Sequence, residues 1–245
     1  MNLEKLSTVV AEKIRPFVKE LIDRYSGNIH SVHIVGSSLT PDYDEKTSDI
    51  NSVVVLKTMD LEFVKFIAPL GRKYKKKGIA APLIMTPEYI AGSLDVFPIE
   101  FLDFTLIHQT IFGEDILKGI NVNATDLRLQ CEREIKSKLI GLRQGYISSL
   151  GDRKILTKNF ADSLAGYMAL FRGIIFLMGK NPPVSKLDVI HSLSNATSVN
   201  TDIFIKILDI RKGKIKPNKE DLKTMFEQYY TSTEKIGKCI DEHQI

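Results

Sequence analysis

The chain has 245 residues, of which 43% are hydrophobic and 26% are charged, so we expect a globular protein of one large or two small domains. Residues 1–120 hold 14 Lys and Arg against 16 Asp and Glu, a net charge of −2, whereas residues 121–245 hold 20 against 14, a net charge of +6. The basic second half has no dense basic run with aromatic residues, so nucleic-acid binding is not expected.

Membrane, secretory and metal-cluster classes are also disfavoured. The longest apolar run, residues 167–179, is far shorter than the roughly 20 residues of a membrane span, and Arg172 interrupts it. The first 13 residues have the pattern of an amphipathic helix and not that of a signal peptide. Cys131 and Cys239 are too few and too far apart for a disulfide framework or a zinc site. We therefore expect a cytoplasmic protein without a membrane span.

The first half mixes helical and strand-like patterns. Apolar residues about 3.6 positions apart indicate helices, and β-branched runs indicate strands. Residues 112–115 look like a linker. Lysines at 73 and 75–77 fall at the end of a predicted helix, where cations offset the helix dipole, so they need no ligand to explain them. Helices are predicted at residues 3–22 and 60–77 and from Pro87, and strands at residues 31–35, 52–56, 79–85 and 96–103.

The second half has only helical patterns. Its apolar residues recur at intervals of three and four, which is typical of a helical bundle. The sequence therefore predicts an α+β protein, with a mixed sheet and flanking helices in residues 1–115 and an all-helical bundle in residues 116–245. The predicted helices of the bundle are residues 125–150, 160–178, 186–193, 202–211 and 219–241.

One pair of segments carries a chemical signal. The strand predicted at 31–35 runs into Gly36 and Ser37, and Asp49 and Asn51 stand at the start of the next strand. A glycine at a strand end lets the backbone approach a phosphate group, and residues two apart on a strand point to the same face. Carboxylates on that face hold the divalent ions that phosphoryl-type transfer requires.

This spacing resembles the signature of the nucleotidyltransferase superfamily, and the helical remainder is similar in layout to the aminoglycoside nucleotidyltransferase branch. The resemblance implies transfer of a nucleoside monophosphate from a nucleoside triphosphate to an acceptor hydroxyl, with Mg²⁺ or Mn²⁺. It implies that Gly36 and Ser37 contact phosphate and that Asp49 is the first metal ligand. We expect the neighbouring Ser38 and Ser48 to contribute to the nucleotide site.

A third acidic residue on a neighbouring strand would complete the metal site. We favour Glu100 as metal ligand or general base, because it lies within an apolar run predicted to be a strand, where an unpaired carboxylate is costly. The branch that the chain resembles also carries a glutamate on the strand that follows. Asp103, nearer the end of the run, is the competing choice.

The sequence departs from the family pattern at Asn51, where the second carboxylate is expected. An asparagine coordinates through its carbonyl oxygen but brings no charge, so a second ion is held more weakly. Two functions stay open: a metal-dependent nucleotidyltransferase, or a nucleotide-binding or regulatory protein that kept the fold and lost the chemistry. The expected partners are a nucleoside triphosphate and a small-molecule or protein acceptor. The oligomeric state cannot be read from the sequence, and a homodimer stays an option.

The remaining polar residues give weaker signals. Arg172, in an apolar helix, either pairs with a buried acid, which we favour, or meets a phosphate. His33, His108 and His191 lack the spacing of a metal site or a catalytic triad, so we expect them to be hydrogen-bonded within the protein or exposed.

Overall fold

The computed structural model describes residues 1–243 of the chain. These residues form two compact units. The first consists of Met1–Val96 and Glu100–Val122, and the second of Phe97–Ile99 and the chain from Asn123 onward. The first unit thus extends beyond residue 115, where the sequence suggested a boundary.

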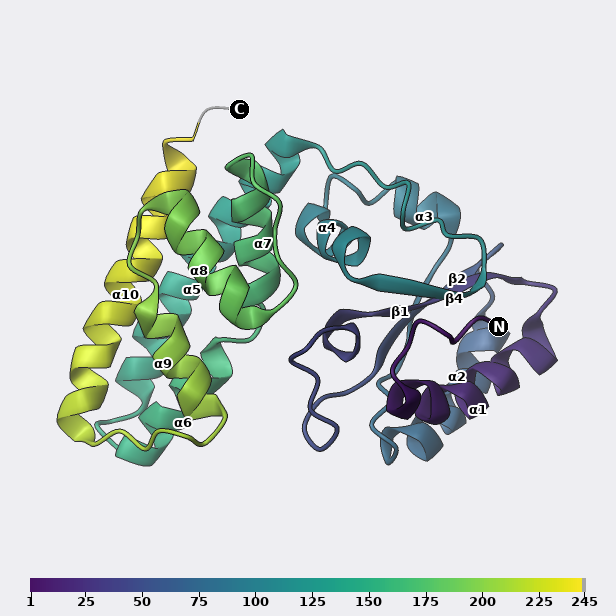
Figure 1. Cartoon of the computed structure of the whole chain (residues 1–245), viewed down its shortest axis with the longest axis horizontal. Helices are drawn as coiled ribbons and strands as arrows, with labels where there is room; N and C mark the ends of the chain where they lie inside the picture. Colours follow the sequence, from purple (N-terminus) through teal and green to yellow (C-terminus); the bar gives the residue numbers. More distant parts are fainter. Residues whose placement is uncertain (244–245) are drawn as a thin grey trace. The chain divides into compact units, whose positions relative to one another are not determined.

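The first unit is built on a four-stranded mixed sheet in the order β3-β2-β1-β4. Strands β1, β2 and β4 are labelled in Figure 1. The central strand β1 pairs antiparallel with β2 on one side and with β4 on the other, while β2 and β3 are parallel. The backbone N–H of Asn2 donates to the Ile111 carbonyl of β4 at 2.8 Å, so the N-terminal segment reaches the strand at the sheet's edge. The strands are β1 Ile29–Val35, β2 Asn51–Leu56, β3 Leu83–Met85 and β4 His108–Gly113.

Two amphipathic helices, α1 (Thr8–Tyr25) and α2 (Leu61–Lys75), supply the apolar side chains that bury one side of this sheet. Each helix has an N-cap: Ser7 accepts a hydrogen bond from the Val10 N–H, and Asp60 accepts one from the Glu62 N–H. Helices α1 and α2 and strands β1 and β2 were predicted from the sequence within a few residues. The core of this unit contains Ile14, Phe17 and Leu21 of α1, Val32 and Ile34 of β1, Val54 and Leu56 of β2, and Phe63 and Ile67 of α2.

The prediction of a strand at residues 96–103 was wrong. This segment contains the start of helix α4 (Pro98–Leu106), which follows the short helix α3 (Pro87–Ala91). Proline has no N–H to give to a sheet but fits the first turn of a helix, and the Ile99 N–H, free of intrahelical partners there, donates to Gln130 Oε1 at 2.7 Å. The strand that completes the sheet is β4, whose last two residues had been assigned to a linker.

The second unit is entirely helical in its described part, and α10 packs along α5 (Figure 1). The prediction of a single helix at 160–178 was wrong. The chain forms two helices that are separated at Gly166, because the φ of +75° at this residue is incompatible with an α-helix. The apolar pattern continues across this break because both helices face the same core. The helices are α5 Ala124–Ser148, α6 Arg153–Ser163, α7 Tyr167–Leu177, α8 Lys186–Thr197, α9 Asp202–Arg211 and α10 Lys219–Asp241.

Aromatic side chains form the centre of this bundle. Phe171 and Phe204 meet edge to face with ring centroids 4.8 Å apart, and Tyr167 and Tyr229 pack beside them. The Tyr167 hydroxyl lies 3.4 Å from Thr233 Oγ1, and burial raises the pKa of Tyr167 to about 12. These phenols therefore stay neutral and act as structural groups.

Within residues 1–243, no single helix is both long enough and apolar enough to cross a membrane; the bent pair α6 and α7 meets both criteria only when taken together.

Candidate functional site

The predicted phosphate-binding turn lies at the end of β1. Gly36 has a φ of +76° and begins a short 3₁₀ helix, η1 (Gly36–Leu39). Asn51 opens β2 directly opposite Val35, and a Cβ built on Gly36 would lie 3.8 Å from Asn51 Nδ2. The structure therefore brings Gly36 and Asn51 together where β1 ends and β2 begins, and an added side chain there would narrow the approach to the backbone.

The serines near the end of β1 and the start of β2 have different surroundings. Ser48 Oγ accepts a hydrogen bond from the Asp44 N–H at 3.2 Å, and the Ser37 carbonyl accepts one from Thr40 Oγ1 at 3.0 Å. Ser38 is buried, and its Oγ has no hydrogen-bond partner among the described residues. Buried polar groups are rarely left unpaired. Ser38 is thus a hydroxyl within the turn that has hydrogen-bonding capacity to spare.

Asp49 lines a cavity of about 360 Å³ that we call the Asp49 cavity. Lys13 forms an ion pair with Glu45 at 3.1 Å, and none of the other four lysines has an ion pair with a described residue. The cavity therefore carries an excess of positive charge around a single aspartate. It is lined by Lys13, Glu45, Lys46, Thr47, Ser48, Asp49, Lys75, Lys76, Lys77 and Gly78.

Strand pairing explains why these lysines lie beside Asp49. The Ile50 N–H donates to the Gly78 carbonyl at 2.7 Å, and the Ala80 N–H donates back to the Ile50 carbonyl at 3.1 Å. The lysine run just before Gly78 is thereby fixed next to the residues just before Ile50. Sequence reasoning had treated these lysines as cations that offset the dipole of α2. The structure ends this helix at Lys75, so Lys76 and Lys77 lie beyond it, and no sequence signal marked that end.

Sheet register also identifies the residue beside Asn51 on the parallel neighbour. Val53 pairs with Leu83, and paired residues of parallel strands point to the same face. Earlier on the two segments the bridge joins Ile50 to Ile79, so the register shifts by one residue and the neighbour of Asn51 is one of the two alanines at 80 and 81. The position where a neighbouring strand would offer a third carboxylate is thus held by an alanine.

Glu100, predicted to supply that carboxylate, lies instead on helix α4, where it is exposed, and Asp103 is half-buried on the same helix. The argument that favoured Glu100 assumed a buried strand, so it does not apply to this helix. Neither residue is on a strand of the sheet.

The donor set does not fit a two-ion site. Asp49 and Asn51 provide one carboxylate and one amide oxygen, and no group of three or more His, Cys, Asp or Glu within residues 1–243 lies close enough to hold a metal ion. At an effective dielectric of about 20, each charge pair missing at 4 Å removes on the order of 4 kcal/mol of attraction. A Mg²⁺ ion that arrives with a triphosphate needs fewer protein ligands, because the phosphate oxygens supply several of its positions.

His33 is a buried residue of β1 whose side chain contacts β4. His33 is 0% exposed, with Nε2 at 2.8 Å from Ser31 Oγ and Nδ1 at 2.8 Å from Thr110 Oγ1. Burial lowers the pKa of His33 to about 4, so the ring is neutral at physiological pH. His108, at the start of β4, contacts the Phe104 carbonyl with Nδ1 and Asp115 Oδ1 with Nε2. These two histidines are hydrogen-bonded within the protein, as the sequence suggested.

The Arg172 side chain donates hydrogen bonds within the helical unit. Its Nε donates to the Pro183 carbonyl at 3.1 Å and its Nη2 to the Val184 carbonyl at 2.9 Å, so it fixes the loop that follows α7.

Comparisons with known proteins identify the fold. No protein-family model matches the chain, and no curated protein sequence matches it. Among solved structures, the chain is similar to spectinomycin adenyltransferase AAD(9) from Enterococcus faecialis, whose crystal structure contains ATP and spectinomycin. The TM-score is 0.54 at 12% sequence identity, and the match covers 91% of this chain and 99% of the other. The predicted α+β fold is therefore confirmed, and it is similar to that of this adenyltransferase.

Proposed function

We propose that this chain is a nucleotide-binding protein that uses the nucleotidyltransferase fold to hold a nucleoside triphosphate without transferring the nucleotide by the two-ion route. The observation that carries the proposal is the Asp49 cavity, in which five lysines accompany the two carboxylates of Glu45 and Asp49. A catalytic two-ion site needs the opposite charge, because it gathers carboxylates around cations.

The negative charge of the triphosphate complements the positive charge of the Asp49 cavity. Lys75, Lys76 and Lys77 supply point charges for phosphate oxygens, and the left-handed Gly36 allows close approach of the backbone. The unpartnered Ser38 hydroxyl adds a hydrogen-bond donor in the same turn. Asp49 can share one Mg²⁺ ion with the phosphates, so binding is expected to be stronger with Mg²⁺ than without it.

The missing carboxylates argue against turnover. Asn51 and the alanines at 80 and 81 stand where the family resemblance leads us to expect carboxylates, and none of them carries a charge. Spectinomycin adenyltransferase AAD(9) was solved with ATP and spectinomycin, so ATP is the first nucleotide to test on this chain. If turnover were found, a small molecule or a protein hydroxyl would be the acceptor.

Calorimetric titration of ATP, GTP, CTP and UTP, each with and without Mg²⁺, tests binding. The K76Q/K77Q variant should bind at least tenfold more weakly, because two phosphate-facing charges are lost. K65Q/K118Q, which removes two exposed lysines of the same unit outside the cavity, should stay within twofold of the wild type. Binding of no triphosphate by the folded wild type would refute the proposal, as would equal losses in the two variants.

The test of lost chemistry rebuilds the donor set. N51D and the double variant N51D/A81E add carboxylates on the two neighbouring segments, so affinity for Mn²⁺ should rise in steps from wild type to double variant. Mn²⁺ titration monitored by electron paramagnetic resonance measures this, and pyrophosphate release from each triphosphate measures turnover. Pyrophosphate release by the wild type with any acceptor would show an active enzyme and overturn this part of the proposal.

A further inference from the structure

A second basic cavity lies in the helical unit. It measures about 320 Å³, and five of its nine lining residues are Lys or Arg while none is acidic. We call it the α6–α9 cavity, because helix α6 and the end of helix α9 with the loop after it form its walls. It is lined by Arg153, Lys154, Thr157, Lys158, Ala161, Ile210, Arg211, Lys216 and Pro217.

The fold assembles this charge from three separate stretches of sequence. Helix α6 packs against α9, and Arg153 Nη1 reaches the Pro217 carbonyl at 3.4 Å across the loop before α10. This places Lys154 of α6 near Arg211 of α9 and Lys216 of the loop, around one hollow. The net charge of +6 in the second half of the chain is therefore concentrated in part at one site, and not spread evenly over a solvated face.

Three cations of the cavity make no side-chain hydrogen bond or ion pair within residues 1–243. Lys158 pairs with Asp162, but Lys154, Arg211 and Lys216 make no hydrogen bond or ion pair through their side chains with a described residue. Asp152 caps the start of α6. The hydrogen bond from the Ile155 N–H is the main reason that the pKa of this capping carboxyl is lowered, and the charges of Lys154 and Arg153 also contribute. Like charges held together repel one another, and a bound anion relieves that repulsion.

The floor of the cavity is apolar, which narrows the class of anion. Ile210 is 6% exposed, Pro217 is buried, and Ala161 lies beside them. Cationic side chains above an apolar floor suit a molecule that carries both phosphate groups and a carbon skeleton. The volume is at the lower end of the roughly 300–1,000 Å³ of small-molecule sites. No aromatic residue lines the cavity, so it lacks the stacking platforms of single-strand nucleic-acid sites.

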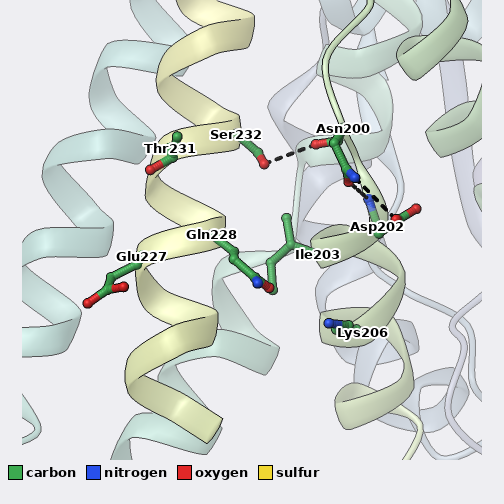
Figure 2. Close-up of a pocket in the computed structure, with 8 residues that line it drawn as sticks. All are labelled: Asn200, Asp202, Ile203, Lys206, Glu227, Gln228, Thr231 and Ser232. Atoms are coloured by element: carbon green, nitrogen blue, oxygen red, sulfur yellow. Dashed lines mark hydrogen bonds between the residues drawn. The ribbon is translucent and has the colours of Figure 1, made fainter.

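A cavity of similar size in the same unit shows the contrast. It measures about 340 Å³ between α9 and α10, and its single lysine, Lys206, is accompanied by Asp202 and Glu227 (Figure 2). Its polar groups already bond to one another: Ser232 Oγ donates to the Asn200 carbonyl at 3.0 Å, and the Asn200 amide contacts Asp202 (Figure 2). A surplus of positive charge is thus a property of the α6–α9 cavity and not of cavities in this bundle generally.

We propose that the α6–α9 cavity binds an organic polyphosphate, a small molecule with two or more phosphate groups. Lys154, Arg211 and Lys216 contact the phosphates, and Ile210 contacts the carbon skeleton. This site uses none of the residues of the Asp49 cavity and stands whether or not that cavity binds a nucleotide.

The test is titration of ADP, ATP and inorganic tripolyphosphate in the K76Q/K77Q background, so that the Asp49 cavity contributes little. Calorimetry should show one site, and R211Q/K216Q added to this background should weaken it at least tenfold. The matched control K206Q/K235Q, two exposed lysines of the same unit outside the cavity, should change affinity less than twofold. ATP should bind more tightly than inorganic tripolyphosphate, because its carbon skeleton adds apolar contact.

Three outcomes would overturn the proposal. The first is that the K76Q/K77Q background binds none of these ligands. The second is that R211Q/K216Q and K206Q/K235Q lose affinity equally. The third is that the protein binds a 20-nucleotide RNA but no polyphosphate. Arg211, Lys216 and Lys154 are exposed, so thermal unfolding should show intact folding, and K154Q offers a second variant with the same expected direction. Loss of nucleotide binding in K76Q/K77Q alone concerns only the Asp49 cavity, so the two proposals fail separately.

Discussion

The buried His33 makes stability depend on pH in a definite direction. Its folded-state pKa is lowered to about 4 from the ordinary 6.5, because burial disfavours the charged ring. Between these two values the unfolded chain binds more protons than the folded chain, so the free energy of unfolding falls as pH falls. The contribution is fully present above pH 6.5 and is lost as pH falls toward 4.

The size of the effect follows from the shift. Each pKa unit corresponds to 1.36 kcal/mol, so a shift of about 2.5 units contributes at most about 3 kcal/mol. Urea unfolding at a series of pH values from 4.5 to 7.5 measures the free energy of unfolding. The difference between wild type and H33Q isolates this histidine, since all other titrating groups are common to both.

We expect the advantage of wild type over H33Q to shrink by about 2–3 kcal/mol from pH 7.5 to 4.5. The exposed His191 offers a control, because H191Q should keep the pH dependence of the wild type. A difference between wild type and H33Q that stays constant across this range would refute the reasoning.

Two close approaches of glycine predict further stability changes. A Cβ on Gly113 would lie 2.0 Å from a backbone oxygen of β1, and the φ of Gly113 is +74°. G113A should therefore lower the free energy of unfolding in urea by at least about 3 kcal/mol. Gly119 has open space around it, so G119A should change that free energy by less than about 0.5 kcal/mol. A Cβ on Gly237 of α10 would lie 2.9 Å from Ile135 Cγ2, so G237A should cost about 1–3 kcal/mol. G141A, in α5 with open space around it, should instead gain about 0.5–1 kcal/mol because alanine favours a helix. A loss in G141A equal to that in G237A would contradict this assignment.

Local signals allowed most helices to be predicted. Helix α10 has the predicted bounds, and its start is fixed by a capping box between Asn218 and Asp221 that lies within four residues of sequence. The segment at 96–103 failed because a short apolar run fits a buried strand and a buried helix equally well. Only Pro98 distinguished them, through the preference of proline for the first turn of a helix.

The site was predictable as far as its residues are close in sequence. The adjacency of Gly36 and Asn51 follows from a hairpin-like return of β1 into β2, which the spacing suggested. The neighbours of Asp49 depend on a longer connection through α2, so the positions of Lys76, Lys77 and Ala81 needed the register of β2 and β3. No pattern within the sequence sets that register.

The edges of the sheet restrict how copies of this chain could associate. On one edge β3 has only three residues and follows Pro82, which has no N–H to offer another strand. On the other edge the Asn2 N–H already occupies the Ile111 carbonyl of β4. Both borders thus resist strand addition, which protects the protein from edge-to-edge aggregation. We therefore expect any homodimer of this chain to form without strand pairing across these two edges.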